Sequence, residues 1–441
     1  MSNQLEYNIN DQNDLDEIRE TLPNEQPKNN KSKIAIIILS SIIAILVIGM
    51  GVYFCLTYIK KDSNDNNNDN NNNDNDKNNQ FRIYYNISYF NKTTEKIENS
   101  FRTEGDHKQF GNINGGKDYN YSDSNYFSMI IPQSAYDNKG GYNKIFLWIH
   151  GGAWVLGNKE EFFELCKYSA NVGYISVTMG YTLLNDTSSG HASIYRIIDE
   201  ITACIKGILL KLKDEKINTE NIQMVIGGGS AGAHISLLYG YFIKEPIVPI
   251  KFIVNIVGPV TINPNYYMAN AKDNDTLENL EPTTVEKALK DKKLKKVNYD
   301  SVNSALLLHI MNYAIGNNYS ESQLDRMIIN ETHLNENDSD YQNLLKESDL
   351  IMSPLNYITK DSPPTINLYG GNDNIVGVMQ YSLLKKKYYE VGYGNDTMIY
   401  VRYSTHTGIF NRSLESTKIA LEEWTTMIGI YGKKFIKNKN N

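Results

Sequence analysis

Cysteine is scarce in this chain, with three in 441 residues. Cys55 lies within a long apolar run, which leaves Cys166 and Cys204 in the main body. This count excludes a disulfide framework of the kind that holds small secreted domains together. The fold must therefore rest on an apolar core, and a hydrophobic content of 41% is enough for one large domain or two ordinary ones.

Clusters of basic residues are also lacking. The chain has 51 acidic against 44 basic residues and a formal net charge of -7. Because no basic patch of note is present, we expect no nucleic-acid partner. We also expect neither a metal nor a cofactor. The mildly acidic balance bears on solubility rather than on fold or partner.

Charge is absent from one long run, Ile34–Ile59. As a helix this run would span roughly 39 Å at ~1.5 Å per residue, enough for the ~30 Å hydrocarbon core of a bilayer. Lysines bracket it, and Tyr53 and Tyr58 lie near one end, where interfacial rings are favoured. We predict a single-pass membrane anchor, because a cleaved signal peptide would be shorter and start earlier.

The segments around the anchor are polar. Residues 1–33 are predicted to be a disordered cytosolic tail. Residues 60–80 are rich in Asn and Asp, and form either a linker that holds the body off the bilayer or an insertion without a role. Sequons cluster after the anchor, with only Asn30 before it, which favours a lumenal or extracellular body. The later sequons open at Asn86, Asn91, Asn120, Asn185, Asn274, Asn318, Asn330, Asn337, Asn395 and Asn411.

Apolar strand patterns alternate with helix patterns in the body. Strands that are apolar throughout and alternate with helices imply a mostly parallel sheet covered on both faces, an α/β architecture. The alternation stops between Ile262 and Ser353, which we predict to be a helical cap insertion over one edge of the sheet. Strands are expected within 125–132, 144–150, 174–181, 222–228, 251–260, 363–373 and 397–406, and helices at 159–173, 193–215, 230–243, 378–392 and 413–432.

The stretch Ile222–Gly240 joins a strand pattern to a helix pattern through Gly228-Gly229-Ser230-Ala231-Gly232. In a G-x-S-x-G corner the serine stands free above the sheet, and the outer glycines let the helix pass the strand. The Ala231 N–H points into the same space, at the positive end of the helix. Ser230 is therefore the candidate nucleophile. The alternative is a glycine-rich turn whose serine only caps the helix.

A second glycine pair, Gly151-Gly152, follows His150 at the end of an earlier strand pattern. Acyl transfer passes through a tetrahedral oxyanion, which needs preorganised donors. We predict that the backbone N–H groups of Gly151, Gly152 and Ala231 form this oxyanion hole, and that His150 orients the loop. A plain strand-ending turn is the alternative, but this loop and Ser230 both fall at carboxyl ends of strands, where ligands bind open α/β sheets.

A serine nucleophile needs a base and a group that orients the base. Of seven histidines, His406 is the one that follows a late strand pattern, and Asp373 follows another strand end. The order Ser230, Asp373, His406 is the one expected for this architecture. Taken singly, Asp373 could be a turn aspartate and His406 a surface histidine. The rival Asp396 starts a strand, so we expect it at the opposite edge of the sheet. His234 is expected to pack.

The span from Tyr119 to Gly432 resembles the α/β-hydrolase fold, in its HGG-type esterase and lipase branch. The stretches "HGGAW", "GGSAGAHI", "SPPTINLYGGNDNIV" and "STHTGIF" match landmarks of that branch. The elbow together with "HGGAW" is most similar to carboxylesterases related to arylformamidases, isoprenylcysteine methylesterases and feruloyl or acetyl-xylan esterases. The resemblance does not extend to the tail, anchor or linker, and the insertion carries no matching motif.

The resemblance implies a serine hydrolase of carboxylic esters in residues 81–437, with Ser230, Asp373 and His406 as triad and a small-molecule or lipid ester as substrate. An arylformamidase-like amide hydrolase stays open, because the triad does not distinguish an ester from an activated amide. So does a non-catalytic interaction module, although the intact triad argues against it. A prolyl-oligopeptidase-type peptidase would need a propeller, and residues 81–140 are too few.

The same fold bears on the two body cysteines. The helices that carry Cys166 and Cys204 belong to crossovers running in opposite directions from one strand. Right-handed crossovers of opposite direction lie on opposite faces of a sheet. Cys166 and Cys204 are therefore predicted to be unpaired.

Overall fold

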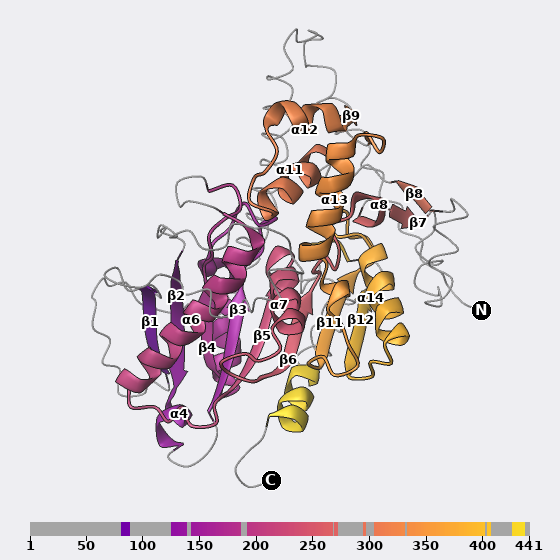
Figure 1. The fold of residues 1–441 in the computed structure, drawn as a ribbon. Coiled ribbons are helices and arrows are strands. Elements are labelled where there is room, and N and C mark those ends of the chain that lie inside the picture. Colours follow the sequence, from indigo (N-terminus) through magenta and orange to yellow (C-terminus); the bar gives the residue numbers. More distant parts are fainter. Residues whose placement is uncertain are drawn as a thin grey trace, which may run out of the picture.

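An eight-stranded sheet forms the centre of the protein in a computed structural model, in the order β1-β2-β4-β3-β5-β6-β11-β12 (Figure 1). The structure describes residues 81–88, 125–138, 143–186, 192–267, 269–271, 294–296, 304–330, 333–401, 404–406 and 426–436. The strands are β1 (Phe81–Ser88), β2 (Tyr126–Pro132), β3 (Lys144–Ile149), β4 (Ile175–Met179), β5 (Gln223–Gly229), β6 (Ile250–Ile256), β11 (Thr365–Gly370) and β12 (Asp396–Val401).

The strands from β4 to β12 are parallel, as the apolar strand patterns predict. Every residue of β4, β5 and β11 is buried, which is the pattern of strands covered on both faces. At one edge β2 pairs antiparallel with β4, and β1 antiparallel with β2. The edge strand β1, whose described side chains are exposed or partly buried, was not among the predicted strands.

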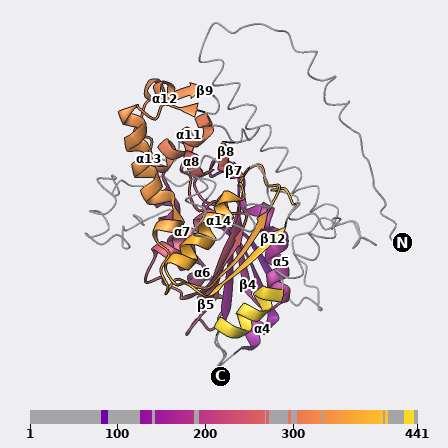
Figure 2. The same cartoon turned by 90° about the vertical axis from the view of Figure 1, so that its right-hand side faces the viewer.

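Helices cover both faces of this sheet, which confirms the predicted α/β layering (Figure 2). One face packs against α6 (Ile194–Asp214), α7 (Ala231–Phe242) and α14 (Met379–Glu390). The other packs against α5 (Phe163–Asn171) and the helical residues 426–435. Cys166 lies in the second layer and Cys204 in the first, and both thiols are free, as predicted; both are also buried.

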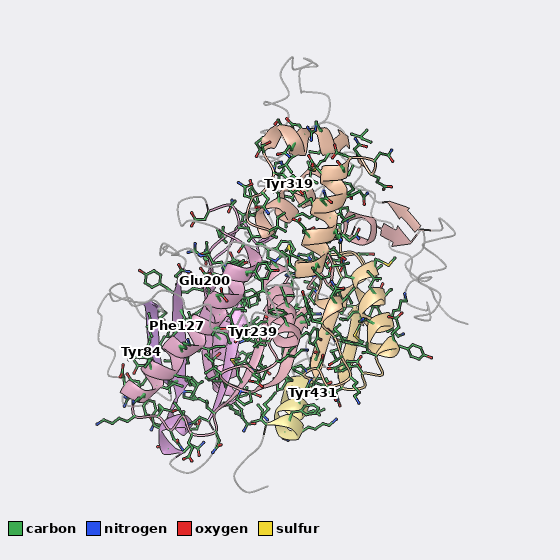
Figure 3. All side chains as sticks on the ribbon, viewed as in Figure 1. Tyr84, Phe127, Glu200, Tyr239, Tyr319 and Tyr431 are labelled. Atoms are coloured by element: carbon green, nitrogen blue, oxygen red, sulfur yellow. The ribbon has the colours of Figure 1, made fainter. Side chains whose placement is uncertain are left out.

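The helix α6 shows how the sequence sets these layers. Ser193 caps its first turn by accepting the backbone N–H of Arg196, and Lys211 and Lys213 lie in the last turn, where cations are favoured. Its apolar stripe faces the sheet. Phe127 of β2 and Tyr239 of α7 lie in the same layer, both fully buried (Figure 3).

The chain between β6 and β11 forms a separate, mainly helical group beyond one end of the sheet, seen at the top of both views (Figures 1 and 2). It also contains two small antiparallel sheets that were not predicted. The elements are α8 (Pro264–Tyr267), β7 (Ala269–Ala271), β8 (Leu294–Lys296), α11 (Ser304–Ala314), α12 (Glu321–Met327), β9 (Ile328–Asn330), β10 (His333–Leu334), α13 (Ser339–Met352) and the 3-10 turn η2 (Pro354–Asn356). Two further short helices are α4 (Gln133–Asp137) and η1 (Lys159–Phe162).

No helix within the described ranges combines the length and the apolar content needed to cross a bilayer. The predicted membrane span Ile34–Ile59, the tail and the linker all lie outside those ranges. Most of the predicted helix at 413–432 lies outside them as well.

Candidate active site

Ser230 occupies the single-residue corner between β5 and α7. Its backbone has φ 54° and ψ -123°, a region that residues other than glycine rarely adopt. Ser230 stands at the N-cap position of α7, yet its side chain makes no capping hydrogen bond. The alternative of a plain cap serine is therefore wrong, since the strained corner presents a hydroxyl that does not serve the helix.

The glycines around Ser230 are required by close backbone contacts. A Cβ on Gly232 would lie 2.1 Å from the carbonyl oxygen of Ile149, at the end of β3. A Cβ on Gly228 would lie 2.4 Å from that same oxygen and 2.6 Å from the carbonyl carbon of Gly232. These distances are far inside van der Waals contact, so only glycine lets α7 leave the strand at this angle.

The loop after β3 lies directly against this corner. A Cβ on Gly151 would be 3.3 Å from the Cβ of Ser230. The carbonyl of Gly151 accepts the Nδ1–H of His150 at 2.8 Å and the hydroxyl of Tyr181 at 3.3 Å. The peptide unit between Gly151 and Gly152 is planar and trans, so its N–H points opposite to its carbonyl. Because the carbonyl of Gly151 faces His150 and Tyr181, the N–H of Gly152 points away from both.

His150 is an orienting residue in this arrangement, as the sequence predicts. It is buried, and its ring stacks on Tyr181 with 4.3 Å between centroids. Burial lowers the pKa of His150 to about 4, so the ring is neutral at physiological pH. With Nδ1 donating to a loop carbonyl, this imidazole fixes the shape of the loop.

Tyr181 was missed in the sequence, and the next residue, Thr182, is bound to a buried ion pair. Arg196 and Glu200, one turn apart on α6, are both fully buried, with 2.9 Å between Nε and Oε1. Glu200 (Figure 3) also accepts the backbone N–H of Thr182 at 2.8 Å and its hydroxyl at 2.5 Å. This fixes the segment that carries Tyr181. Thr182 and Glu200 are 18 positions apart, so the bonds between them leave no local signal in the sequence.

Asp373 and His406 lie in contact just beyond the carboxyl ends of β11 and β12. The distance from His406 Nδ1 to Asp373 Oδ2 is 2.7 Å, and both side chains are buried. A carboxylate only accepts, so Nδ1 carries a hydrogen, and in the neutral ring Nε2 carries the lone pair. The other oxygen of Asp373 accepts the backbone N–H groups of Ile375 at 2.9 Å and Val376 at 2.8 Å.

Backbone bonds between the two loops keep this pair in place. Gly371 donates to the carbonyl of Val401 at 2.9 Å, and Asn372 donates to the carbonyl of Ser404 at 3.0 Å. The rival carboxylate of Asp396 lies at the other end of the sheet, because Asp396 is paired with Thr365 at the start of β11.

The sequence-predicted residues thus gather at the end of the sheet where the parallel strands have their carboxyl ends. The structure brings Gly151 against Ser230 and His406 against Asp373. The strands β5 and β11 are separated only by β6, which places their ends roughly 10 Å apart at the usual spacing of ~4.8 Å per strand. In the part of the chain that is described, no group of three or more His, Cys, Asp and Glu side chains could hold a metal.

A comparison with protein families decides the relationship. The profile of the BD-FAE family matches residues 134–388, more than half of the chain. The chain belongs to the BD-FAE family. BD-FAE is a hydrolase family, and the expectation of an ester hydrolase with the α/β-hydrolase fold is confirmed. The matched span contains Ser230 and Asp373 and ends before His406.

Solved structures resemble this BD-FAE protein at low identity. A truncated carbohydrate esterase from gut microbiota is 16% identical, with a TM-score of 0.43 over 69% of this chain and 93% of that one. Esterase B from Lactobacillus Rhamnosis (HN001) is 13% identical, with a TM-score of 0.47 over 89% and 96%. A vibralactone cyclase is 14% identical, with a TM-score of 0.49 over 95% and 94%. No curated protein matches the chain in sequence.

Proposed function

We propose that this BD-FAE protein is a membrane-anchored serine esterase, in which Ser230 is the nucleophile, His406 the base and Asp373 the group that orients the base. The observation that carries the proposal is that Ser230 has a strained backbone and a hydroxyl that does not cap α7, and that it lies at the same end of the sheet as a buried Asp373–His406 pair. A hydroxyl presented in this way has no structural use in the helix, and a neutral histidine whose Nδ1–H is bound to a carboxylate can accept the hydroxyl proton at Nε2.

Acylation begins when the Oγ of Ser230 attacks the ester carbonyl carbon and His406 Nε2 takes the hydroxyl proton. Asp373 stabilises the imidazolium that forms. The carbonyl π electrons move to oxygen, and the N–H groups of Gly151, Gly152 and Ala231 receive the oxyanion. The tetrahedral intermediate collapses, the carbon–oxygen bond to the alcohol breaks, and His406 gives its proton to the leaving alkoxide.

Deacylation repeats these steps with water. His406 Nε2 removes a proton from water as its oxygen attacks the acyl carbon, and a second oxyanion forms in the same hole. Collapse breaks the bond to the Oγ of Ser230, which recovers its proton from His406. The products are a carboxylic acid and an alcohol, and the enzyme returns to its starting state.

Labelling with a fluorophosphonate probe tests the nucleophile. The wild-type chain, in membrane fractions of the expressing cells, should be labelled on Ser230 and should hydrolyse p-nitrophenyl esters. Ser230→Ala should abolish labelling and lower turnover by roughly 10⁴-fold or more. Full labelling of the alanine variant would move the nucleophile elsewhere and reject the proposal.

The substrate class can be narrowed with the wild-type protein. The insertion between β6 and β11 lies beyond the end of the sheet that carries Ser230, which supports its assignment as a cap over the substrate (Figure 1). A panel of p-nitrophenyl esters of increasing chain length, with an aryl formamide beside them, measures the preference. Faster cleavage of the formamide than of every ester would favour an amide hydrolase over an esterase.

We further propose that the body lies outside the cytosol and is glycosylated. Its support is the position of the sequons, since those whose side chains the structure describes are all exposed. They are Asn185, Asn318, Asn337 and Asn395. Glycosidase treatment of the full-length protein should change its mobility on a gel. An unchanged mobility, with the tail rather than the body protected from protease in sealed vesicles, would reverse the orientation.

A further inference from the structure

His234 lies in the first turn of α7 and uses both of its ring nitrogens. It is fully buried, as predicted, but it does more than fill space. Its Nε2 is 2.6 Å from the carbonyl oxygen of Met352, and its Nδ1 is 3.1 Å from the indole Nε1 of Trp154. Since a carbonyl only accepts and an indole only donates, Nε2 carries the hydrogen and Nδ1 accepts. The tautomer is therefore fixed from both sides.

The indole partner belongs to the loop that follows Gly151. Gly152, Ala153 and Trp154 all have positive φ, at 102°, 50° and 64°. Glycine adopts this region freely, but alanine and tryptophan are held there against a steric cost. Two contacts of Trp154 oppose that cost, because its carbonyl accepts the N–H of Leu184 at 2.9 Å and its indole donates to His234.

The carbonyl partner belongs to a third element. Met352 is the last residue of α13, and the carbonyls of a last helical turn have no partner within their own helix. The Nε2–H of His234 satisfies that carbonyl. One imidazole therefore joins the strained loop, the helix that follows Ser230 and the end of the insertion.

We propose that His234 is a positioning residue for the oxyanion hole: it holds Trp154, and through it the N–H of Gly152, in place, and it ties that loop to the insertion through Met352. The proposal rests on the function proposed above. The effect on the kinetic constants follows from the role of the loop, which contacts the oxyanion and not the ground-state substrate. An N–H that stabilises only the oxyanion changes kcat and leaves KM nearly unchanged.

Two conservative replacements separate the two bonds of His234. In His234→Asn the amide oxygen can occupy the place of Nδ1 and accept the indole N–H, while the bond to Met352 is lost. In His234→Gln the amide nitrogen reaches the region of Nε2 and can donate to Met352, while the acceptor for Trp154 is lost. Trp154→Phe removes the indole donor directly and keeps an aromatic ring.

Trp148→Phe is the matched control. Trp148 is also fully buried, and its indole donates to the hydroxyl of Ser169 at 3.0 Å, in the layer on the other face of the sheet. This variant removes a buried indole hydrogen bond whose acceptor lies outside the loop. Complete fluorophosphonate labelling counts the folded sites in each full-length variant, so that kcat is expressed per site and the rate of labelling reports the oxyanion hole.

We expect Trp154→Phe to lower kcat per site by about 10- to 100-fold, with KM within about 3-fold, and to slow labelling in proportion. Trp148→Phe should keep the wild-type kcat per site, and His234→Asn should retain more activity than His234→Gln. Equal kcat for the two tryptophan variants, or a glutamine variant more active than the asparagine one, would overturn the proposal. Failure of the wild type to label on Ser230 would instead reject the proposed nucleophile.

Discussion

Asp373→Asn replaces one oxygen by an NH₂ group without changing the size of the side chain, and its effect follows from the hydrogen bonds of both carboxylate oxygens. Oδ1 accepts two backbone N–H groups, from Ile375 and Val376. An NH₂ group at that position would face two donors, so the amide must place its oxygen there. The NH₂ group then faces His406 Nδ1, where the carboxylate Oδ2 lies now.

This orientation reverses the tautomer of His406. Nδ1 must accept from the amide, so the ring hydrogen moves to Nε2, which can no longer take a proton from Ser230. The imidazolium also loses its counter-charge. Together these effects should lower kcat on the order of 10⁴-fold, or about 5 kcal/mol in transition-state free energy. Stability should fall by only about 1–2 kcal/mol, since neutral hydrogen bonds replace charge-assisted ones in the same positions.

The assay compares kcat on p-nitrophenyl acetate with the urea midpoint of each variant. Asp396→Asn is the matched control, because Asp396 lies at the start of β12, at the far end of the sheet from His406. It should leave kcat within about 3-fold of the wild type. The reasoning is refuted if Asp373→Asn stays within tenfold of the wild type, or if Asp396→Asn is the variant that loses turnover.

Two predictions concern stability. Gly232→Ala should lower the free energy of unfolding by about 3 kcal/mol or more, because its Cβ would lie 2.1 Å from the Ile149 carbonyl oxygen, and neither group can rotate away; Gly394→Ala, with no atom within 4 Å, should change it far less. Burial lowers the pKa of both His150 and His234 from 6.5 to about 4. The unfolded chain therefore binds more protons than the folded chain between these pH values. The free energy of unfolding should have its full value above pH 6.5 and fall by about 3 kcal/mol per histidine as the pH drops to 4. Urea titrations at several pH values measure this change. A free energy of unfolding that rises on acidification would contradict the neutral state assigned to His150 and His234.

The elbow around Ser230 could be predicted because its sequence pattern is local: Gly228 and Gly232 stand two positions to either side of the serine. The atoms that a side chain would meet there are not all local, since both glycines lie against the carbonyl of Ile149 at the end of the neighbouring strand β3. The strands β5 and β11 could be predicted for a similar reason, since both are mainly apolar and bounded by glycine or proline. A short pattern determines each of these features.

The residues that hold the site together could not be predicted in the same way. Tyr181 contacts the carbonyls of His150 and Gly151. Asn255 on β6 donates to Asn367 at 2.8 Å and to the hydroxyl of Tyr369 at 3.0 Å, both on β11 and both buried. Each of these bonds joins residues far apart in sequence, and a buried polar residue carries no periodicity of its own. Such contacts follow from the order of the strands, which the sequence pattern does not specify.

Strand order also decides which aspartate can hold His406. Asp396 is closer to His406 in sequence and starts the strand that leads to it. Parallel strands put their starts at one edge and their ends at the other, so the residue that begins β12 is a strand length away from the residue that follows it. Asp373 follows the end of the neighbouring strand β11, and it therefore meets His406 across one strand spacing. The acid partner of a base in such a sheet is found by asking which strand ends beside it, not which carboxylate lies nearest along the chain.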